Sequence, residues 1–133
     1  MLDGLLIRVP WIDKILDGSK TWEIRGSHTS KEGRIGLIES GTGTVVGVAE
    51  LVGVVGPLSL KELSANWRKA GFDSDEHLFR LPYKQTFAWV LQNPEKLRQP
   101  VPYNHPSGAV IWVRLKPNVE QAVLRQVGAI YRG

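Results

Sequence analysis

The chain has no cysteine, which excludes disulfide bonds and thiolate metal sites, and its three histidines lack the spacing of a zinc site. It has no apolar run approaching the ~20 residues that a membrane-spanning helix needs. The first four residues carry no basic side chain of the kind that opens a secretory signal. We therefore expect a cytoplasmic protein that needs no metal or other cofactor and has no membrane partner.

A glycine-rich phosphate loop, a GxSxG motif and internal repeats are also absent from the sequence. The remaining composition is that of an ordinary globular protein, with 42% hydrophobic and 23% charged residues in 133 positions. We expect one domain over residues 1–133. The net charge of +4 and the pI of about 9.6 favour a polyanionic partner such as nucleic acid.

Short apolar or β-branched runs between turn residues predict strands at residues 5–9, 20–25, 34–40, 44–55, 86–91 and 109–115. Gly47 and Gly53 suggest bends or bulges in the longest of these strands. About six strands with few, short helices predict a mainly β fold of the α+β type, a small β-barrel with helical insertions.

Two helices are predicted between the strands. Residues 11–16 follow Pro10 with apolar side chains at helical spacing, and Gly18 suits a left-handed end. Ser59 and Glu62 form a capping box that opens a helix to about residue 70. We expect a short helical or irregular segment at 73–80, an ordered irregular loop at 92–106 because of its four prolines, and a helical or mobile tail at 117–133.

The segment from Gly18 to Arg25 carries the most informative charges. Lys20, Glu23 and Arg25 lie within an apolar setting, where charges are costly unless they are paired or functional. Strand alternation places Glu23 and Arg25 on one face of the predicted strand. This segment is therefore the predicted centre of the protein's chemistry.

The pattern Gly18-x-Lys20-x-x-Glu23-x-Arg25 resembles the GxKxxExR signature of the ASCH (activating signal cointegrator homology) family. The Pro-Trp helix start before it, the strand at 36–40 after it, and the late Trp-Val and Ile-Trp-Val-Arg strands around a proline-rich loop extend the likeness over residues 4–116. The resemblance implies a PUA-like β-barrel with a cleft beside the motif strand.

The resemblance also implies an association with RNA. Some members of the family look like RNA-binding modules, some cleave single-stranded RNA, and a bacterial branch deacetylates N4-acetylcytidine. That branch uses a lysine, a threonine three residues later and a glutamate near the end of the first long helix. Lys20 matches the lysine, but Glu23 stands at the threonine position and residues 69–71 offer no carboxylate, so the deacetylase pattern is only partly matched.

Each charged residue of the motif has a functional and a structural interpretation. Lys20 can act in acid–base chemistry with Glu23, hold a phosphate, or pair with a glutamate on a neighbouring strand. Glu23 can accept a base amino group while Arg25 binds a phosphate through its planar fork, or the two can form an ion pair that orients the cleft wall.

Further candidate ligand contacts lie outside the motif. Trp11 is a candidate for base stacking, with a core position as the alternative, whereas the other four tryptophans are expected in the core. The turn from Glu39 and Ser40 to Gly43 is either an anion cradle or a plain hairpin turn. Tyr103, His105 and Ser107 are candidates because loops on a rigid scaffold often carry function; the solvated surface is the alternative for His105.

We therefore expect a domain that binds single-stranded RNA or a modified nucleoside or nucleotide through Trp11, Lys20, Glu23, Arg25, Glu39, Ser40, Tyr103 and Ser107. The alternative is a metal-independent hydrolase of single-stranded RNA or an N-acylated nucleoside, with Lys20 and Glu23 as catalytic residues. A third hypothesis is a protein-interaction domain. We expect a monomer or a weak dimer.

Overall fold

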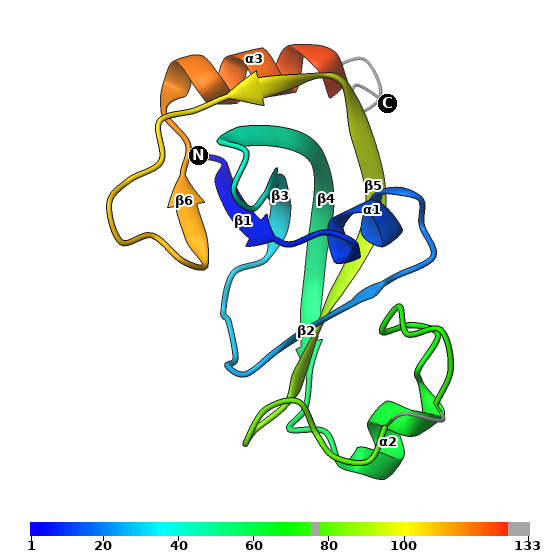
Figure 1. The fold of residues 1–133 in the computed structure, drawn as a ribbon. Helices are drawn as coiled ribbons and strands as arrows, with labels where there is room; N and C mark the ends of the chain where they lie inside the picture. Colours follow the sequence, from blue (N-terminus) through cyan, green and yellow to red (C-terminus); the bar gives the residue numbers. More distant parts are fainter. Residues whose placement is uncertain (76–77, 128–133) are drawn as a thin grey trace.

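A computed structural model describes residues 1–75 and 78–127. Six strands form one sheet in the order β2-β5-β4-β3-β1-β6, which curls into a half-barrel, and three short helices pack around it (Figure 1). β1 and β3 are parallel and the other neighbours are antiparallel. The predicted mainly β architecture with short helices is confirmed. The elements are β1 (Asp3–Ile7), α1 (Trp11–Leu16), β2 (Trp22–Arg25), β3 (Gly33–Glu39), β4 (Thr44–Val55), α2 (Leu60–Ala65), β5 (Phe87–Pro102), β6 (Trp112–Arg114) and α3 (Pro117–Val127).

β4 has the predicted bounds, and irregular pairing occurs where its glycines predict it. The register with β5 shifts between Val45 and Gly47, between Val48 and Glu50, and between Leu51 and Gly53, so two of the three shifts lie at a glycine. Packing also requires a glycine at position 47, because a Cβ there would lie 2.4 Å from Cδ2 of Leu16. The absence of a side chain at this position lets α1 pack closely against the sheet.

The irregular loop predicted at 92–106 is wrong over most of its length, because β5 continues to Pro102. Extra residues of β5 bulge out against β4 between Gln92 and Glu95 and between Lys96 and Val101. Three of the four prolines lie in or next to these bulges, where a missing N–H removes no ladder bond. In the second bulge the N–H of Gln99 donates to a side chain of α3 (3.1 Å). Figure 1 shows that β5 bends in its second half and then runs along α3.

The capping box of α2 is confirmed, since Ser59 Oγ accepts from the N–H of Glu62 and the Glu62 side chain accepts from the N–H of Ser59. The predicted helix end at residue 70 is wrong, because α2 ends at Ala65 and residues 66–71 form turns. The carbonyl oxygen of Lys69 is turned toward β2, where it accepts from the N–H groups of residues 21 and 22. These tertiary bonds replace further helical turns.

Other boundaries shift by a few residues. The first strand ends at Ile7, the second begins at Trp22, and the last, predicted over 109–115, is β6 at 112–114 with single backbone bonds continuing on either side. The predicted C-terminal helix is present as α3, while residues 128–133 of the predicted tail lie outside the described residues. Gly18 adopts the expected left-handed conformation (φ 87°).

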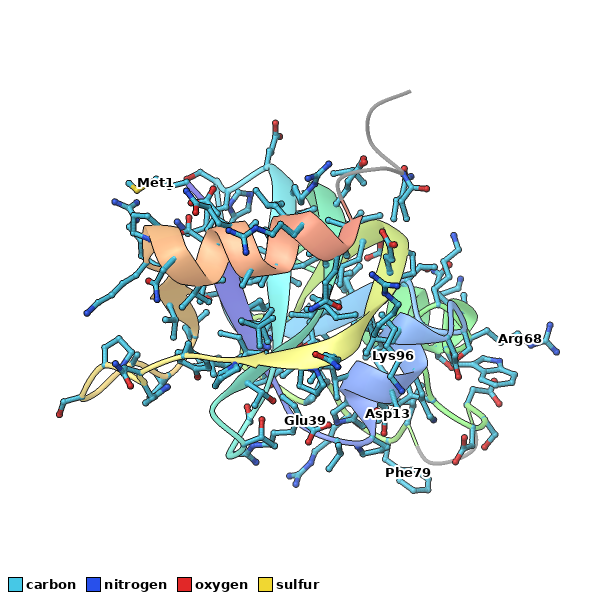
Figure 2. All side chains as sticks on the ribbon, turned by 90° about the horizontal axis from the view of Figure 1, so that it is seen from above. Met1, Asp13, Glu39, Arg68, Phe79 and Lys96 are labelled. Atoms are coloured by element: carbon cyan, nitrogen blue, oxygen red, sulfur yellow. The ribbon has the colours of Figure 1, made fainter. Side chains whose placement is uncertain are left out.

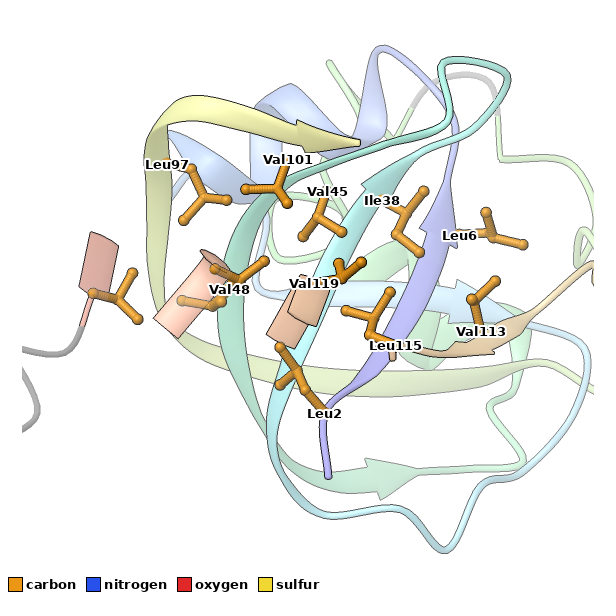
Figure 3. Packing of buried hydrophobic residues seen from close by; sticks show 12 residues of the cluster. Leu2, Leu6, Ile38, Val45, Val48, Leu97, Val101, Val113, Leu115 and Val119 are labelled. Carbon is orange, nitrogen blue, oxygen red and sulfur yellow. The ribbon is translucent and has the colours of Figure 1, made fainter. Parts of the chain in front are cut away.

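One hydrophobic cluster lies between the sheet and α3 (Figure 3). Val119, Val123 and Val127 supply one buried face of α3. The cluster also contains Leu2, Leu6, Ile38, Val45, Val48, Leu97, Val101, Val113 and Leu115. Across the described residues, no helix is long and apolar enough to cross a membrane.

The segment between β4 and β5 (residues 56–86) extends below the sheet in Figure 1. Arg68 and Phe79 lie at the periphery of the molecule on this segment (Figure 2), and Phe79 is 80% exposed. Its inner part packs against β2 through a separate cluster that includes Trp22, Leu58 and Leu63. We call residues 56–86 the insertion.

Candidate functional site

A cleft of about 810 Å³ lies beside β2. Its walls come from the end of β1, α1, β2, the β3–β4 turn, the insertion and the loop between β5 and β6. The lining residues are Leu6, Arg8, Trp11, Lys20, Glu23, Ile24, Arg25, Ser40, Gly41, Gly43, Phe72, Pro82, Tyr83, Tyr103, His105, Ala109 and Val110. Segments far apart in the sequence thus meet at one cavity of a size that suits a small ligand.

Lys20 lies at the floor of this cleft and is only 3% exposed. Its ammonium donates to the carbonyl oxygen of Trp22 (2.6 Å) and to that of Ala70 in the insertion. Oε1 of Glu23 lies 3.6 Å away. The ammonium therefore points its hydrogen atoms at acceptors of the protein, which compensates for its burial.

Burial lowers the pKa of Lys20 to about 8, although the carboxylate of Glu23 opposes this shift. The side chain is thus mainly protonated at neutral pH and becomes neutral within a mildly alkaline range. The expected pairing of Lys20 with a glutamate on a neighbouring strand is not what the structure shows. Its carboxylate partner is Glu23, three residues further along the same segment, and its other partners are carbonyl oxygens.

Glu23 and Arg25 form an ion pair. Nε and Nη2 of Arg25 lie 3.0 Å and 2.8 Å from Oε2 of Glu23. Nη2 also donates to the carbonyl oxygen of Leu6 in β1 (2.7 Å), which joins β2 to a strand at the other side of the curled sheet. The guanidinium of Arg25 therefore stabilises the fold and also lines the cleft.

Two lysines bind successive carbonyls of the insertion. Lys14 donates to the carbonyl oxygen of Gly71 (2.6 Å), next to the Ala70 carbonyl that Lys20 binds. Gly71 has a φ of 82°, and a Cβ there would lie 2.8 Å from Cδ of Lys20. The ring of Trp11 lies beside both ammonium groups, 5.0 Å from Nζ of Lys20 and 5.4 Å from Nζ of Lys14. The half-buried indole thus covers the floor of the cleft.

On the wall formed by the β5–β6 loop, Tyr103 and His105 are hydrogen-bonded. Oη of Tyr103 lies 2.9 Å from Nδ1 of His105, and Nε2 of the ring lies 2.9 Å from the carbonyl oxygen of Ala109. Burial raises the pKa of Tyr103, so the phenol stays protonated at neutral pH.

Most of the predicted site residues meet at the cleft, namely Trp11, Lys20, Glu23, Arg25, Ser40 and Tyr103. Glu39 and Ser107 are not among its lining residues. The turn at 40–43 contributes two glycines to the lining, and Thr42 donates its hydroxyl to the carbonyl oxygen of Glu39 (2.8 Å) as in an ordinary turn.

Sequence reasoning missed Arg8, Phe72 and Tyr83. The charge of Arg8 at the end of an apolar strand was a signal that could have been used, because strand ends commonly border binding sites. The sequence around Phe72 and Tyr83 contains no signal for a site, since it is the packing of the insertion that brings these residues to the cleft beside β2. Tyr83 lies close to Gly26, where a Cβ would be 2.8 Å from its ring. In residues 1–75 and 78–127 no three His, Asp or Glu side chains are grouped to hold a metal ion.

The half-barrel with its cleft beside β2 defines a PUA-like domain. A family model, the ASCH domain, matches residues 5–101, and the chain belongs to this family. Its fold is similar to crystal structures of ASCH from Zymomonas mobilis and of a single-residue variant, with TM-scores of 0.67, 17% identity, 92% of this chain covered, and 93% and 94% of those chains covered. At this identity the likeness concerns the fold alone. No curated protein matches the chain.

Proposed function

We propose that this protein binds single-stranded RNA or a modified nucleoside or nucleotide in the cleft beside β2. Membership of the ASCH family, whose members are generally RNA-binding, supports this function. The cleft volume of about 810 Å³ suits a nucleotide, and its lining combines aromatic rings with cationic side chains. Tyr83, at 45% exposed, offers a ring to a base at the mouth of the cleft.

The observation that carries the proposal is the exposed guanidinium of Arg8 at the cleft. Lys20 and Arg25 direct N–H groups at protein acceptors. Arg8 is exposed at the cleft, and in the described part of the chain its guanidinium has no hydrogen-bond or ion-pair partner. A free guanidinium fork beside aromatic rings is suited to a phosphate group.

Glu23 is the proposed contact for the base. Its Oε2 accepts from Arg25, while Oε1 lies 3.6 Å from Lys20 and keeps a lone pair for a further donor. An exocyclic amino group of a base is such a donor. The contacts from Arg25 hold the carboxylate in a fixed orientation.

Binding is favoured over the hydrolase alternative because of the contacts of Lys20. A lysine that takes a proton from substrate or water needs a nitrogen directed at the reacting atom. The ammonium of Lys20 is directed at two carbonyls and at Glu23 instead.

The test is fluorescence anisotropy with a labelled, mixed-sequence single-stranded RNA dodecamer at several salt concentrations. Affinity should fall as salt rises from about 50 to about 200 mM, because phosphate contacts release counterions. Arg8→Ala should weaken binding by about tenfold and lower the magnitude of the log–log salt slope by about 0.7. Its melting temperature should equal that of the parent, because no contact within the described structure is lost.

Arg98→Ala is the matched control. Arg98 is an exposed arginine of β5 outside the cleft lining, so its loss removes the same charge from the molecule without touching the cleft. Equal effects of the two substitutions would show that only net charge matters. Affinity that does not respond to salt, or that Arg8→Ala leaves unchanged, would contradict the proposal.

A further inference from the structure

The hydrogen-bonded pair of Tyr103 and His105 has a proton arrangement that its partners determine. The ring nitrogen Nε2 of His105 lies 2.9 Å from the carbonyl oxygen of Ala109. Because a carbonyl oxygen only accepts hydrogen bonds, Nε2 must carry a proton. In the neutral ring the other nitrogen, Nδ1, then has a lone pair, and Tyr103 must donate its hydroxyl proton to it across 2.9 Å.

This arrangement limits what Tyr103 can offer to a ligand. While His105 is neutral, the hydroxyl proton is engaged and only lone pairs of Oη remain for a molecule in the cleft. When His105 gains a second proton, both ring nitrogens donate, so Nδ1–H points at Oη of Tyr103. The hydroxyl proton is then released from His105 and becomes available to an acceptor in the cleft.

We propose that Tyr103 is a specificity-determining residue of the cleft and that His105 decides whether it accepts or donates. The inference rests on the proposed function, since the ligand it describes is a nucleobase. With neutral His105, Tyr103 selects a base edge that presents an amino or imino N–H. With protonated His105, Tyr103 selects a carbonyl oxygen or an unprotonated ring nitrogen.

Other ionisable groups share the cleft with His105 and must be kept constant in a test. They are Arg8 at the end of β1, Lys20, Glu23 and Arg25 around β2, Tyr83 of the insertion and Tyr103 itself. Lys20 titrates at about 8, so measurements at or below about pH 7 leave it protonated. Protonation of His105 also adds a positive charge, which strengthens the binding of every polyanion and therefore cannot by itself change the choice between two bases.

Hexacytidylate and hexauridylate are suitable probes because they carry equal backbone charge and have nearly the same shape. Cytosine has an amino donor where uracil has a carbonyl acceptor, and the donor and acceptor roles of ring nitrogen N3 are also exchanged. We expect the ratio of the two Kd values to change by about fivefold or more between about pH 7.0 and about pH 5.5. The direction of the change identifies the base atom that Tyr103 contacts.

Two variants remove the selection in different ways. Tyr103→Phe deletes the hydroxyl group, and His105→Gln replaces the imidazole ring, so each should give a ratio that is the same at both pH values. His28→Gln is the control, because His28 is an exposed histidine outside the cleft lining. It should retain the full change of the parent protein.

The outcomes separate this inference from the proposed function. A change of ratio that survives Tyr103→Phe overturns the inference, and so does a constant ratio in the parent protein while Arg8→Ala still weakens binding. If neither oligonucleotide binds the parent protein, both proposals are wrong. Nitrogen-15 NMR of the histidine rings adds a readout without ligand, because a neutral His105 protonated at Nδ1 instead of Nε2 would also overturn the inference.

Discussion

At the residue scale, Lys20 combines a functional position with structural contacts. It lines the cleft, yet its ammonium connects β2 to the insertion through the carbonyl of Ala70, 50 positions further along the chain. Buried polar groups lose more when one partner is removed than they gain when the bond forms. Replacing Lys20 therefore takes a hydrogen-bond donor away from the carbonyl oxygens of both Trp22 and Ala70.

We expect Lys20→Met to lower the free energy of unfolding by about 1–3 kcal/mol at pH 7, as measured by urea denaturation, because it leaves two carbonyls without their donor. The loss should grow with pH. Burial lowers the pKa of Lys20 to about 8 in the folded protein, from its ordinary value of 10.5. Between these values the unfolded chain binds more protons, so the parent gains stability as pH rises and the variant does not.

The matched control for this experiment is Lys96→Met, at an exposed lysine of β5 (Figure 2). It should leave the urea midpoint close to that of the parent at each pH. The gap between parent and Lys20→Met should widen by about 1–2 kcal/mol between about pH 8 and about pH 9.5. A gap that stays constant or narrows over this range would mean that Lys20 does not have a lowered pKa.

At the scale of elements, the second half of β5 depends on α3. Gln126 accepts from the N–H of Gln99 (3.1 Å) and donates to its carbonyl oxygen (2.9 Å). A glutamine amide thus takes the place of a neighbouring strand for one residue of a bulge. This double bond supports the strand where its prolines prevent regular pairing.

We expect Gln126→Ala to increase the hydrogen-exchange rate of the Gln99 amide by about tenfold, with a global stability loss of only about 1 kcal/mol. Gln121→Ala, at an exposed glutamine of the same helix, tests whether any loss of a glutamine from α3 has this effect. Equal protection of Gln99 in both variants would show that the side-chain bonds do not hold the bulge.

The same element shows which parts of the fold could be predicted from the sequence. β4 and the capping box of Ser59 were predictable because neighbouring residues determine them. The second half of β5 was not predictable, because a proline-rich sequence is equally compatible with a loop and with a bulged strand. The hydrogen bond with Gln126 that supports the strand also comes from another element. The end of α2 was missed for a similar reason, since residues of β2 bind the carbonyl of Lys69.

The site was predictable to a similar extent. The spacing of Lys20, Glu23 and Arg25 placed three charges on one short segment, and they do meet. Their partners were not predictable, because the carbonyls of Leu6 and Ala70 belong to distant segments and carry no side-chain signal. Arg8 was missed because a single charge at a strand end is common on protein surfaces.

At the scale of the whole molecule, Arg25 connects strands that the sheet order keeps apart. β2 is an edge strand and β1 lies near the opposite edge, yet Nη2 of Arg25 reaches the carbonyl oxygen of Leu6 in β1. Its guanidinium also lies 5.5 Å from the ring centre of Trp89 in β5. One side chain therefore bridges the open side of the half-barrel beside the cleft.

We expect Arg25→Lys to lower the free energy of unfolding by about 1–3 kcal/mol although it keeps the positive charge, because an ammonium group cannot reproduce the guanidinium's fork to Glu23 and its bond to Leu6. Urea denaturation measures the change, with Arg98→Lys as the exposed control. Unchanged stability together with weaker RNA binding would instead assign Arg25 to phosphate contact alone.

The left-handed turn at Gly71 couples two positions that are distant in the sequence, residues 20 and 71. An alanine there would strain the backbone and press against the aliphatic part of Lys20. The disturbance would pass to the ammonium and from there to Glu23, although residue 71 itself does not line the cleft. Engineering of ligand choice in this protein therefore has to treat residues 20 and 71 as a single unit, to be exchanged together or left alone.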